Sequence, residues 1–248
     1  MEIIDFVTVL LVGLVGGFFN TFMGAGSLLS IPALISLGLP PHVAIATNRL
    51  GVLGSDIAGW YEFHVKGMIN YRIAIILAVP SLIGAIIGAN LIFEFNESNL
   101  KLIVGIVTLV ILALLMLNPS AGIERAKHRV GFINYAGGIS ASFIIGIYGG
   151  FYGAGAGTFL FYVLIFFFGQ TFLESAGSRG LANFSYSFMA AAIFAYKGVI
   201  NYIWVIPLFI GSFAGSYLSA HYSDRIGNVW LKRIFVTVVV LLAIKLFI

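Results

Sequence analysis

Residues 20–32 read NTFMGAGSLLSIP, and residues 152–162 read YGAGAGTFLFY. Both stretches contain several glycines and hydroxyl side chains, and both lie between long apolar segments. Inside a lipid bilayer no water reaches the backbone, so an interrupted helix is tolerated only where it faces protein or a water-filled cavity. We therefore interpret these two stretches, called here the first and second glycine breaks, as the functional site of the protein.

The overall composition is that of a membrane protein. Of the 248 residues, 60% are hydrophobic and 9% are charged, and the mean hydropathy is +1.08. So few charges cannot cover the surface of a soluble domain of this length. The sequence has no cysteine, which excludes disulfides and thiolate metal sites. The net charge of +4 forms no basic stripe for nucleic acid, and we expect no metal and no other cofactor.

Apolar segments of about 20 residues predict membrane-spanning helices. Such spans are predicted at 71–92, 99–117, 202–221 and 229–247, with more polar helices at 42–64 and 172–195. The two remaining segments, 4–37 and 131–168, are too long for one span each. As a single helix the first would reach about 50 Å, well beyond a hydrocarbon core of about 30 Å. We therefore expect each segment to fold back at its glycine break into a second helix of about 12 residues.

The second half of the sequence repeats the first. Adding 131 to a residue number converts Gly24-Ala25-Gly26 into Gly155-Ala156-Gly157, and converts the KGxINY motif at 66–71 into its copy at 197–202. Such self-similarity marks a duplicated fold. The predicted architecture is an all-α, polytopic helical membrane protein built from two homologous repeats. Each repeat is a glycine-broken hairpin followed by three transmembrane helices, with the first repeat at 1–118, a basic linker at 119–130 and the second repeat at 131–248.

Loop charges predict that the two repeats are inverted. The loops at 65–72 and 118–130 carry lysine and arginine, whereas the loop at 93–98 carries Glu94 and Glu97, and basic loops stay in the cytoplasm. If each broken segment returns to its starting side, the second repeat is inverted and both chain termini are extracytoplasmic. Lys197 then lies outside, against the rule. If each broken segment instead crosses the membrane once, the repeats are parallel.

Each break exposes the N-terminus of the helix that follows it. Unpaired N–H groups and the helix dipole make such an end an anion site, and transporters built from repeats place broken helices at the repeat interface. Two helix N-termini are expected to converge there from opposite sides. The candidate ligand-binding residues at the breaks are Gly24, Gly26, Ser27, Gly155, Gly157 and Thr158.

The helices after the breaks carry Asn48-Arg49 and Ser178-Arg179. An arginine in mid-membrane is costly, so it faces a cavity or a partner, and its planar fork donates two parallel hydrogen bonds to an oxyanion. Two arginines at near-equivalent positions predict a shared anionic ligand, and we take all four residues as candidate binding residues. A carboxylate or carbonyl partner is the alternative for either arginine.

Four further polar residues are candidates of lower rank. Asp56 is seven residues from Arg49 and so on the same helix face, which makes it a candidate for proton coupling or for an internal ion pair. Asn20 and Asn183 are second-tier candidates for the site. Glu174 lies near a predicted helix start, where the helix dipole favours a carboxylate.

Three segments resemble a known family. GGFFNTFMGAGSLLSIP, GLPPHVAIATN and KGMINYR are similar to motifs of the TauE/SafE sulfite-exporter family, also called the 4-toluene-sulfonate uptake permease family, over nearly the whole chain. The resemblance implies a multi-pass carrier of sulfite, thiosulfate, sulfonates or related anions in a prokaryotic inner membrane. Two departures put the cargo in question: Val163 stands where a proline is expected, and Asn48-Arg49 replaces small residues.

The leading functional hypothesis is therefore a secondary transporter that moves a small sulfur-containing oxyanion by alternating access. The sequence has no GxxxxGK[ST] loop for ATP, and no GxSxG or HExxH motif for an intramembrane enzyme. A carrier or channel for a cation or another small solute is the main alternative, because Asp56 and the asparagines could serve a cation. The anion, the direction of transport, the coupling ion and the oligomeric state, a homodimer included, are left open.

Overall fold

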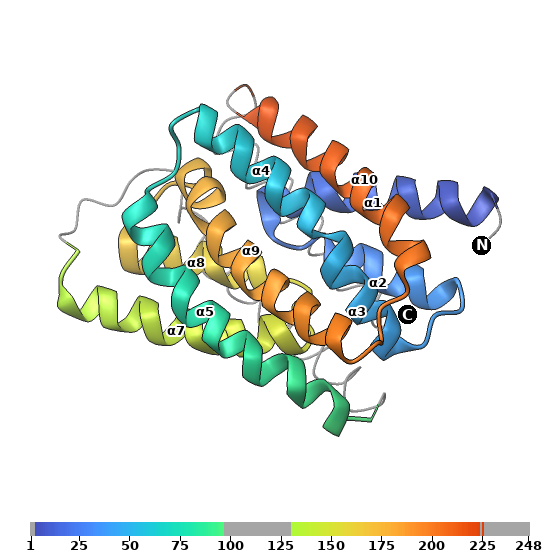
Figure 1. Ribbon diagram of the computed structural model, residues 1–248. Coiled ribbons are helices and arrows are strands. Elements are labelled where there is room, and N and C mark those ends of the chain that lie inside the picture. The colour runs from blue at the N-terminus through green and yellow to red at the C-terminus, as the bar shows by residue number, and fades with distance from the viewer. Residues whose placement is uncertain (1–2, 97–129, 224, 226–248) are drawn as a thin grey trace, which may run out of the picture.

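The computed structural model describes residues 3–96, 130–223 and 225, and its described elements are helices (Figure 1). The predicted spans at 99–117 and 229–247 lie outside the described residues, as does most of the linker. The elements are α1 (Ile3–Met23), α2 (Ser27–Ser36), α3 (Pro41–Gly51), α4 (Leu53–Val65), α5 (Tyr71–Leu91), the 3-10 turn η1 (Ile92–Glu94), α7 (Phe132–Phe151), α8 (Ala156–Phe168), α9 (Phe172–Tyr196) and α10 (Tyr202–His221).

Several of these helices are long and apolar enough to cross a membrane. Among the described residues, α1, α5 with η1, α7 and α10 meet this condition, and α8 with α9 forms a further candidate span bent by 118°. The protein is thus a multi-pass helical membrane protein, as the composition predicts. Apolar side chains on the outer faces of these helices, such as Ile83 and Ile210, are exposed, as lipid contact requires.

Both glycine breaks are sharp turns between two helices, as predicted. Leu34 near the end of α2 packs with Val9 near the start of α1. In the second half, the ring of Phe168 at the end of α8 lies 5.5 Å from that of Tyr135 at the start of α7. Each short helix therefore returns along its long partner. The lengths of α2 and α8, 10 and 13 residues, are close to the expected length.

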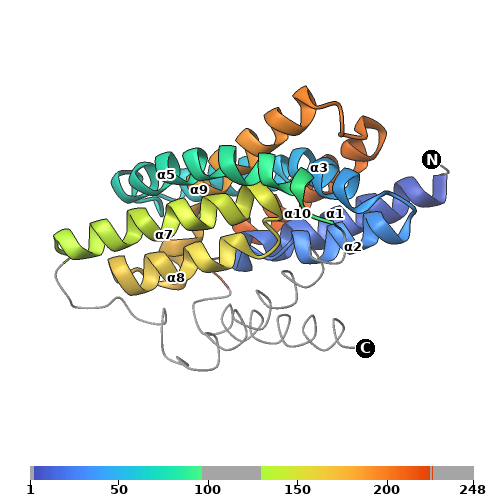
Figure 2. The ribbon, with the colours of Figure 1, turned by 90° about the horizontal axis from the view of Figure 1, so that it is seen from below.

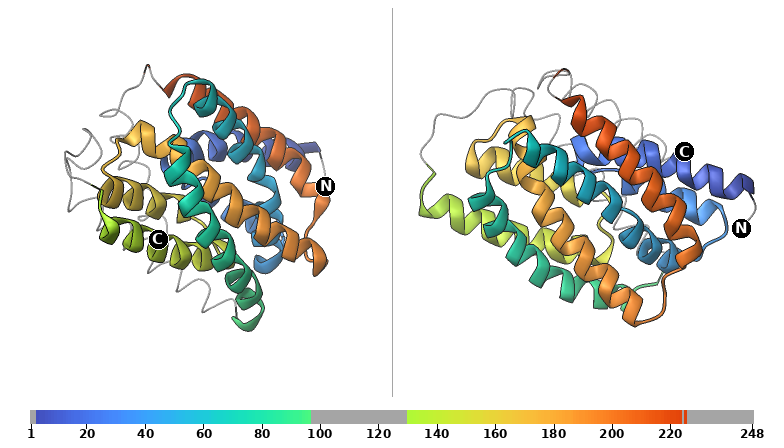
Figure 3. Two further views of the ribbon diagram at one scale, coloured as in Figure 1. Left: turned by 60° about the vertical axis from the view of Figure 1, so that its left-hand side comes forward. Right: turned by 45° about the horizontal axis from the view of Figure 1, so that its top comes forward.

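Small residues let the two halves interlock. Helix α1 packs along α10 and α7 packs along α5 (Figures 2 and 3), so the first helix of each half contacts a late helix of the other. A Cβ added at Gly88 would lie 2.8 Å from the carbonyl carbon of Ile147, and one at Gly215 would lie 2.7 Å from that of Leu14. This backbone contact is typical of helix packing in membranes. Gly84 and Gly211 make the same kind of close backbone contact, with Phe143 and Leu10.

Helices α4 and α9, which align in the two repeats, run in opposite directions. Asp56 of α4 bonds to Asn183 of α9, while Phe63, further along α4, lies beside Gly177, earlier in α9. The two helices are therefore antiparallel, although α4 occupies in the first half the place that α9 occupies in the second. This direction is the one expected of inverted repeats; the orientation of each half in a membrane stays a prediction.

The prediction of one continuous helix at 42–64 is wrong. The segment expected as one helix at 42–64 is divided into α3 and α4, with Val52 between them. Ser212 of α10 donates a hydrogen bond of 2.8 Å to the carbonyl of Gly51, and Ser55 donates one of 2.8 Å to the carbonyl of Val52. The carbonyl of Val52 also accepts the backbone N–H of Asp56 at 3.1 Å, and the hydroxyl of Ser212 supplies a donor to Gly51 from another helix, as is typical where a side chain inserts at a helix interruption.

Candidate functional site

The two glycine breaks touch each other at the centre of the protein. A Cβ added at Gly157 would lie 2.6 Å from the Cα of Gly24, so the contact is between backbones. Gly24 has φ +66° and Gly155 has φ +80°, values that side-chain-bearing residues rarely adopt. The sequence thus needs glycine at the breaks for the turn itself and for the contact between them. Helix α8 begins at this contact, at Ala156, and α2 begins shortly after Gly24, at Ser27.

Each arginine crosses to the break of the other half. Arg179 on α9 donates from Nη2 to the backbone carbonyls of Asn20 and Thr21, the latter at 2.7 Å. Arg49 on α3 donates from Nη2 to the carbonyl of Tyr152. Thr21 and Tyr152 are equivalent residues of the two repeats. The carbonyl partner considered from the sequence is therefore present for both arginines, and each guanidinium caps the C-terminal end of a broken helix.

The carbonyl bonds do not use all the hydrogen-bonding groups of the two arginines. Both side chains are buried, Arg49 at 1% exposure and Arg179 at 3%. The Nε of each has no hydrogen-bond partner among the described residues. Arg179 also lies 4.6 Å from the ring centre of Phe161. A buried donor without a partner is costly, so both arginines keep a donor for a further acceptor.

Asp56 lies beside the arginines in a polar cluster. Its Oδ1 accepts hydrogen bonds from the side-chain amides of Asn183 at 3.1 Å and Asn20 at 3.3 Å. Within the described part of the chain, its Oδ2 has no partner and the carboxylate makes no ion pair with either arginine. The predicted ion pair is therefore not formed. Both second-tier asparagines lie in the site, and they hold this carboxylate.

A small cavity opens at this cluster. Its volume is about 20 Å³, and its lining includes Asn20, Asp56 and Arg179. A cavity of about 10–15 Å³ is enough for one water molecule. An anion of several heavy atoms is larger than this space.

Other predicted site residues stabilise the fold around the break. Asn48 accepts a bond from Ser30 at 2.5 Å and donates one to Ser27 at 2.9 Å, so it fixes the start of α2 to α3. Ser27 belongs to this network, Gly26 lies at the start of α2, and both residues are buried. Thr158, at the start of α8, is fully buried.

Two predicted site residues lie away from the cluster. The hydroxyl of Ser178 accepts from the backbone N–H of Asn70 at 3.1 Å, just before α5 begins. Glu174 accepts from the backbone N–H of Thr171 at 2.9 Å and forms a capping box at the start of α9. Ser178 and Glu174 therefore support helix starts, which for Glu174 agrees with the interpretation based on the helix dipole.

The structure adds site residues that the sequence reasoning missed. Ser55 accepts a hydrogen bond of 2.7 Å from Asn20, and Tyr186 donates one of 2.5 Å to Asn183. Thr21 lies 2.6 Å from the hydroxyl of Ser216 on α10. The spacing Arg179, Asn183, Tyr186 places three polar groups on one helix face, and this signal could have identified the tyrosine.

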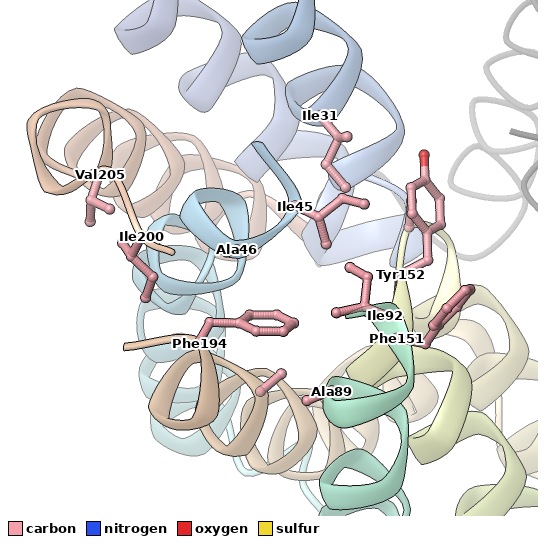
Figure 4. Close-up of a cluster of buried hydrophobic side chains, with 12 residues drawn as sticks. Ile31, Ile45, Ala46, Ala89, Ile92, Phe151, Tyr152, Phe194, Ile200 and Val205 are labelled. Atoms are coloured by element: carbon pink, nitrogen blue, oxygen red, sulfur yellow. The ribbon is translucent and has the colours of Figure 1, made fainter. Parts of the chain in front are cut away.

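Apolar clusters lie toward either end of α4 and α9 from the polar centre. In one, Phe194 of α9 points toward Ile45 and Ile92 (Figure 4); we call it the Phe194 cluster. The other contains Phe63, Phe161, Ile165, Phe172, Ala176 and Ala220 and is called the Phe63 cluster. Phe63 and Phe194 are equivalent residues of the two repeats. Because α4 and α9 are antiparallel, these two phenylalanines lie toward opposite ends of the helix pair.

Broken helices that meet inside a bundle of membrane-length helices, with buried arginines beside them, are a feature of helical membrane transporters. Comparison with known proteins gives the particular family. The chain belongs to the sulfite exporter TauE/SafE family, whose model matches residues 9–246. This confirms the resemblance found in the sequence.

Curated relatives of this chain have names that indicate transport. A probable membrane transporter protein of Haemophilus influenzae is 28% identical over 218 residues, which cover 88% of this chain and 85% of the relative. The probable membrane transporter protein YfcA of Escherichia coli K12 is 24% identical over 235 residues, covering 95% and 87%. A Sinorhizobium relative with the same kind of name is 27% identical, covering 94% and 88%. These names point to a transporter and away from an enzyme. No solved structure matches this chain.

Proposed function

We propose that this protein is a secondary transporter for a small sulfur-containing oxyanion of the sulfite, thiosulfate or sulfonate class. It would work in a prokaryotic cell membrane by alternating access between two inverted repeats. The observation that carries the proposal is the convergence of two buried arginines on the touching glycine breaks, each arginine with an unpartnered Nε among the described residues. The family name agrees with a sulfur oxyanion.

The charge of the centre supports an anion over a cation. Arg49 and Arg179 together outweigh Asp56, so a cation would enter a region of net positive charge and be repelled. Guanidinium groups suit an oxyanion, because their planar forks match its oxygens. In this mechanism the anion takes the donors that now lack a partner, and the helix N-termini of α2 and α8 add a favourable dipole.

Alternating access would use the two apolar clusters as gates. The Phe194 cluster and the Phe63 cluster contain equivalent phenylalanines, and they lie toward opposite ends of the pair formed by α4 and α9. Opening one cluster while the other stays closed would expose the centre to one side of the membrane at a time.

Thermal stabilisation of the detergent-solubilised protein tests the cargo. Sulfite, thiosulfate, methanesulfonate, sulfate and chloride are added in turn, since a ligand that binds the folded state raises stability by mass action. We expect a selective rise with a sulfur anion that is lost in Arg179→Lys, which keeps the charge and removes the planar fork. Arg72→Lys, at the start of α5, is the matched control and keeps the response. Stabilisation by a cation and by no anion would overturn the proposal.

A second measurement tests alternating access. The chain has no cysteine, so Ser55→Cys places a single thiol beside Asn20 in the polar centre. A membrane-impermeant thiol reagent, applied to sealed vesicles of known orientation, should label it from either side. Labelling from one side should fall when the cargo gradient favours the opposite state. A thiol that stays reactive from both sides regardless of cargo would indicate a channel.

A further inference from the structure

We propose that the charge of the polar centre sets the proton stoichiometry. A singly charged anion binds to the site as it stands, whereas a doubly charged anion binds together with one proton, which Asp56 accepts. The inference rests on the proposed function and adds to it the rule that couples cargo charge to protons.

The buried charges of the centre do not cancel. Among the described residues, the buried charged side chains are Arg49, Asp56, Glu62 and Arg179. Glu62 lies near the end of α4, where its Oε2 is 3.2 Å from Nδ1 of His221, and so belongs to that end of the bundle. The centre therefore holds two positive charges and one negative charge. Unbalanced charge is expensive in a membrane interior, and one monoanion restores neutrality.

Asp56 and the anion would share one space. Both Asp56 and Arg179 line the central cavity, and in the described part of the chain each has a buried atom without a partner, Oδ2 in the aspartate and Nε in the arginine. An anion that binds Arg179 in this cavity would therefore share the space with the carboxylate of Asp56. Two negative groups in one site favour a proton on one of them. The protonated carboxyl can then donate its O–H to the anion.

Of Asp56 and the groups that face it, Asp56 is the one that can change its charge near neutral pH. Arginine stays protonated in proteins, and a tyrosine hydroxyl ionises only well above neutral pH. The remaining groups are neutral amides and hydroxyls. The residues facing Asp56 from the elements packed against α4 are Asn20 and Thr21 of α1, Arg49 of α3, Arg179, Asn183 and Tyr186 of α9, and Ser216 of α10.

A dianion then gains a neutral site by proton uptake. With Asp56 protonated, the centre carries two positive charges, and a dianion balances them. The proton comes from water on the side to which the site is open and moves with the anion. Because binding takes up a proton, the affinity for a dianion falls as pH rises, by up to about tenfold per pH unit. The affinity for a monoanion does not follow this trend.

Calorimetry measures the proton count directly. The detergent-solubilised protein is titrated with thiosulfate and with methanesulfonate in two buffers of different ionisation enthalpy. Neither anion changes its own charge near neutral pH, so the buffer-dependent heat reports protons taken up by the protein. We expect about one proton per thiosulfate and none per methanesulfonate.

Two variants assign the proton to its acceptor. Asp56→Asn should abolish proton uptake with thiosulfate, while Asp5→Asn in the first turn of α1, about 20 Å along that helix from Asn20, should keep it. Thiosulfate binding without proton uptake, equal uptake with both anions, or uptake that survives in Asp56→Asn would each overturn the inference and leave the proposed function standing. Failure of both anions to bind would overturn the proposed function as well.

Discussion

Replacing Gly24 with alanine should destabilise the protein through two separable effects. The backbone there has φ +66°, and a left-handed conformation costs a residue with a Cβ about 1–2 kcal/mol. The added Cβ would also lie 2.6 Å from the backbone nitrogen of Thr158, and overpacking of this kind costs about 1–3 kcal/mol more. Gly24→Ala should therefore lose about 2–5 kcal/mol of unfolding free energy.

Gly67→Ala is the matched control for this substitution. Gly67 has the same φ of +66°, and a Cβ added there would meet no atom within 4 Å. It should lose the backbone contribution of about 1–2 kcal/mol alone. Thermal unfolding in detergent compares the two, at about 2–4 °C per kcal/mol for a chain of this size. Equal shifts for Gly24→Ala and Gly67→Ala would refute the direct contact between the two glycine breaks.

Four other substitutions, with one control, test residues outside the polar centre. Thr47→Val and Ser178→Ala each leave a backbone N–H before α10 or α5 without its acceptor. In thermal unfolding, each should lower the unfolding free energy by about 1–3 kcal/mol and leave anion affinity unchanged. A loss of anion binding in Ser178→Ala would show that Ser178 belongs to the site. Phe194, at 0% exposure, and Phe188, at 50% exposure, form a second pair: Phe194→Ala should lose about 3–5 kcal/mol of unfolding free energy, and Phe188→Ala should lose much less in the same assay. Lys66→Gln removes the charged donor to the last carbonyls of α10 and should cost about 0.3–1 kcal/mol of unfolding free energy. Because salt screens the charge of Lys66, added salt should reduce this stabilisation in the wild type.

Much of the fold follows from local sequence. Long apolar segments predict α1, α5, α7 and α10 because lipid leaves few alternatives to a helix. The glycine breaks predict the two hairpins because a single helix of that length overshoots a bilayer. The interruption between α3 and α4 could not be predicted in this way. It depends on a hydroxyl of Ser212 that reaches Gly51 from a helix distant in sequence.

The candidate site shows the same division at the level of single residues. Arg49, Arg179 and Asp56 can be selected from sequence because charged side chains in apolar helices are costly and need a reason. Ser178 is a candidate through its proximity to Arg179, but it faces the start of α5. Asn20 and Asn183 are weaker candidates from sequence, yet they share the carboxylate of Asp56. Adjacent residues on a helix point to different neighbours, so proximity in sequence does not give proximity in space.

The sequence by itself determined the membrane class, the internal duplication, the two helix breaks and the family. Each of these depends on composition, spacing or local conformation, which are properties of neighbouring residues. The tertiary structure decided that Gly24 meets Gly157, that each arginine serves the break of the other half, and that Asp56 keeps one oxygen without a partner among the described residues. These features arise from packing between segments more than a hundred residues apart. A local sequence pattern shows that a glycine permits close backbone contact, but it does not show which other backbone makes that contact.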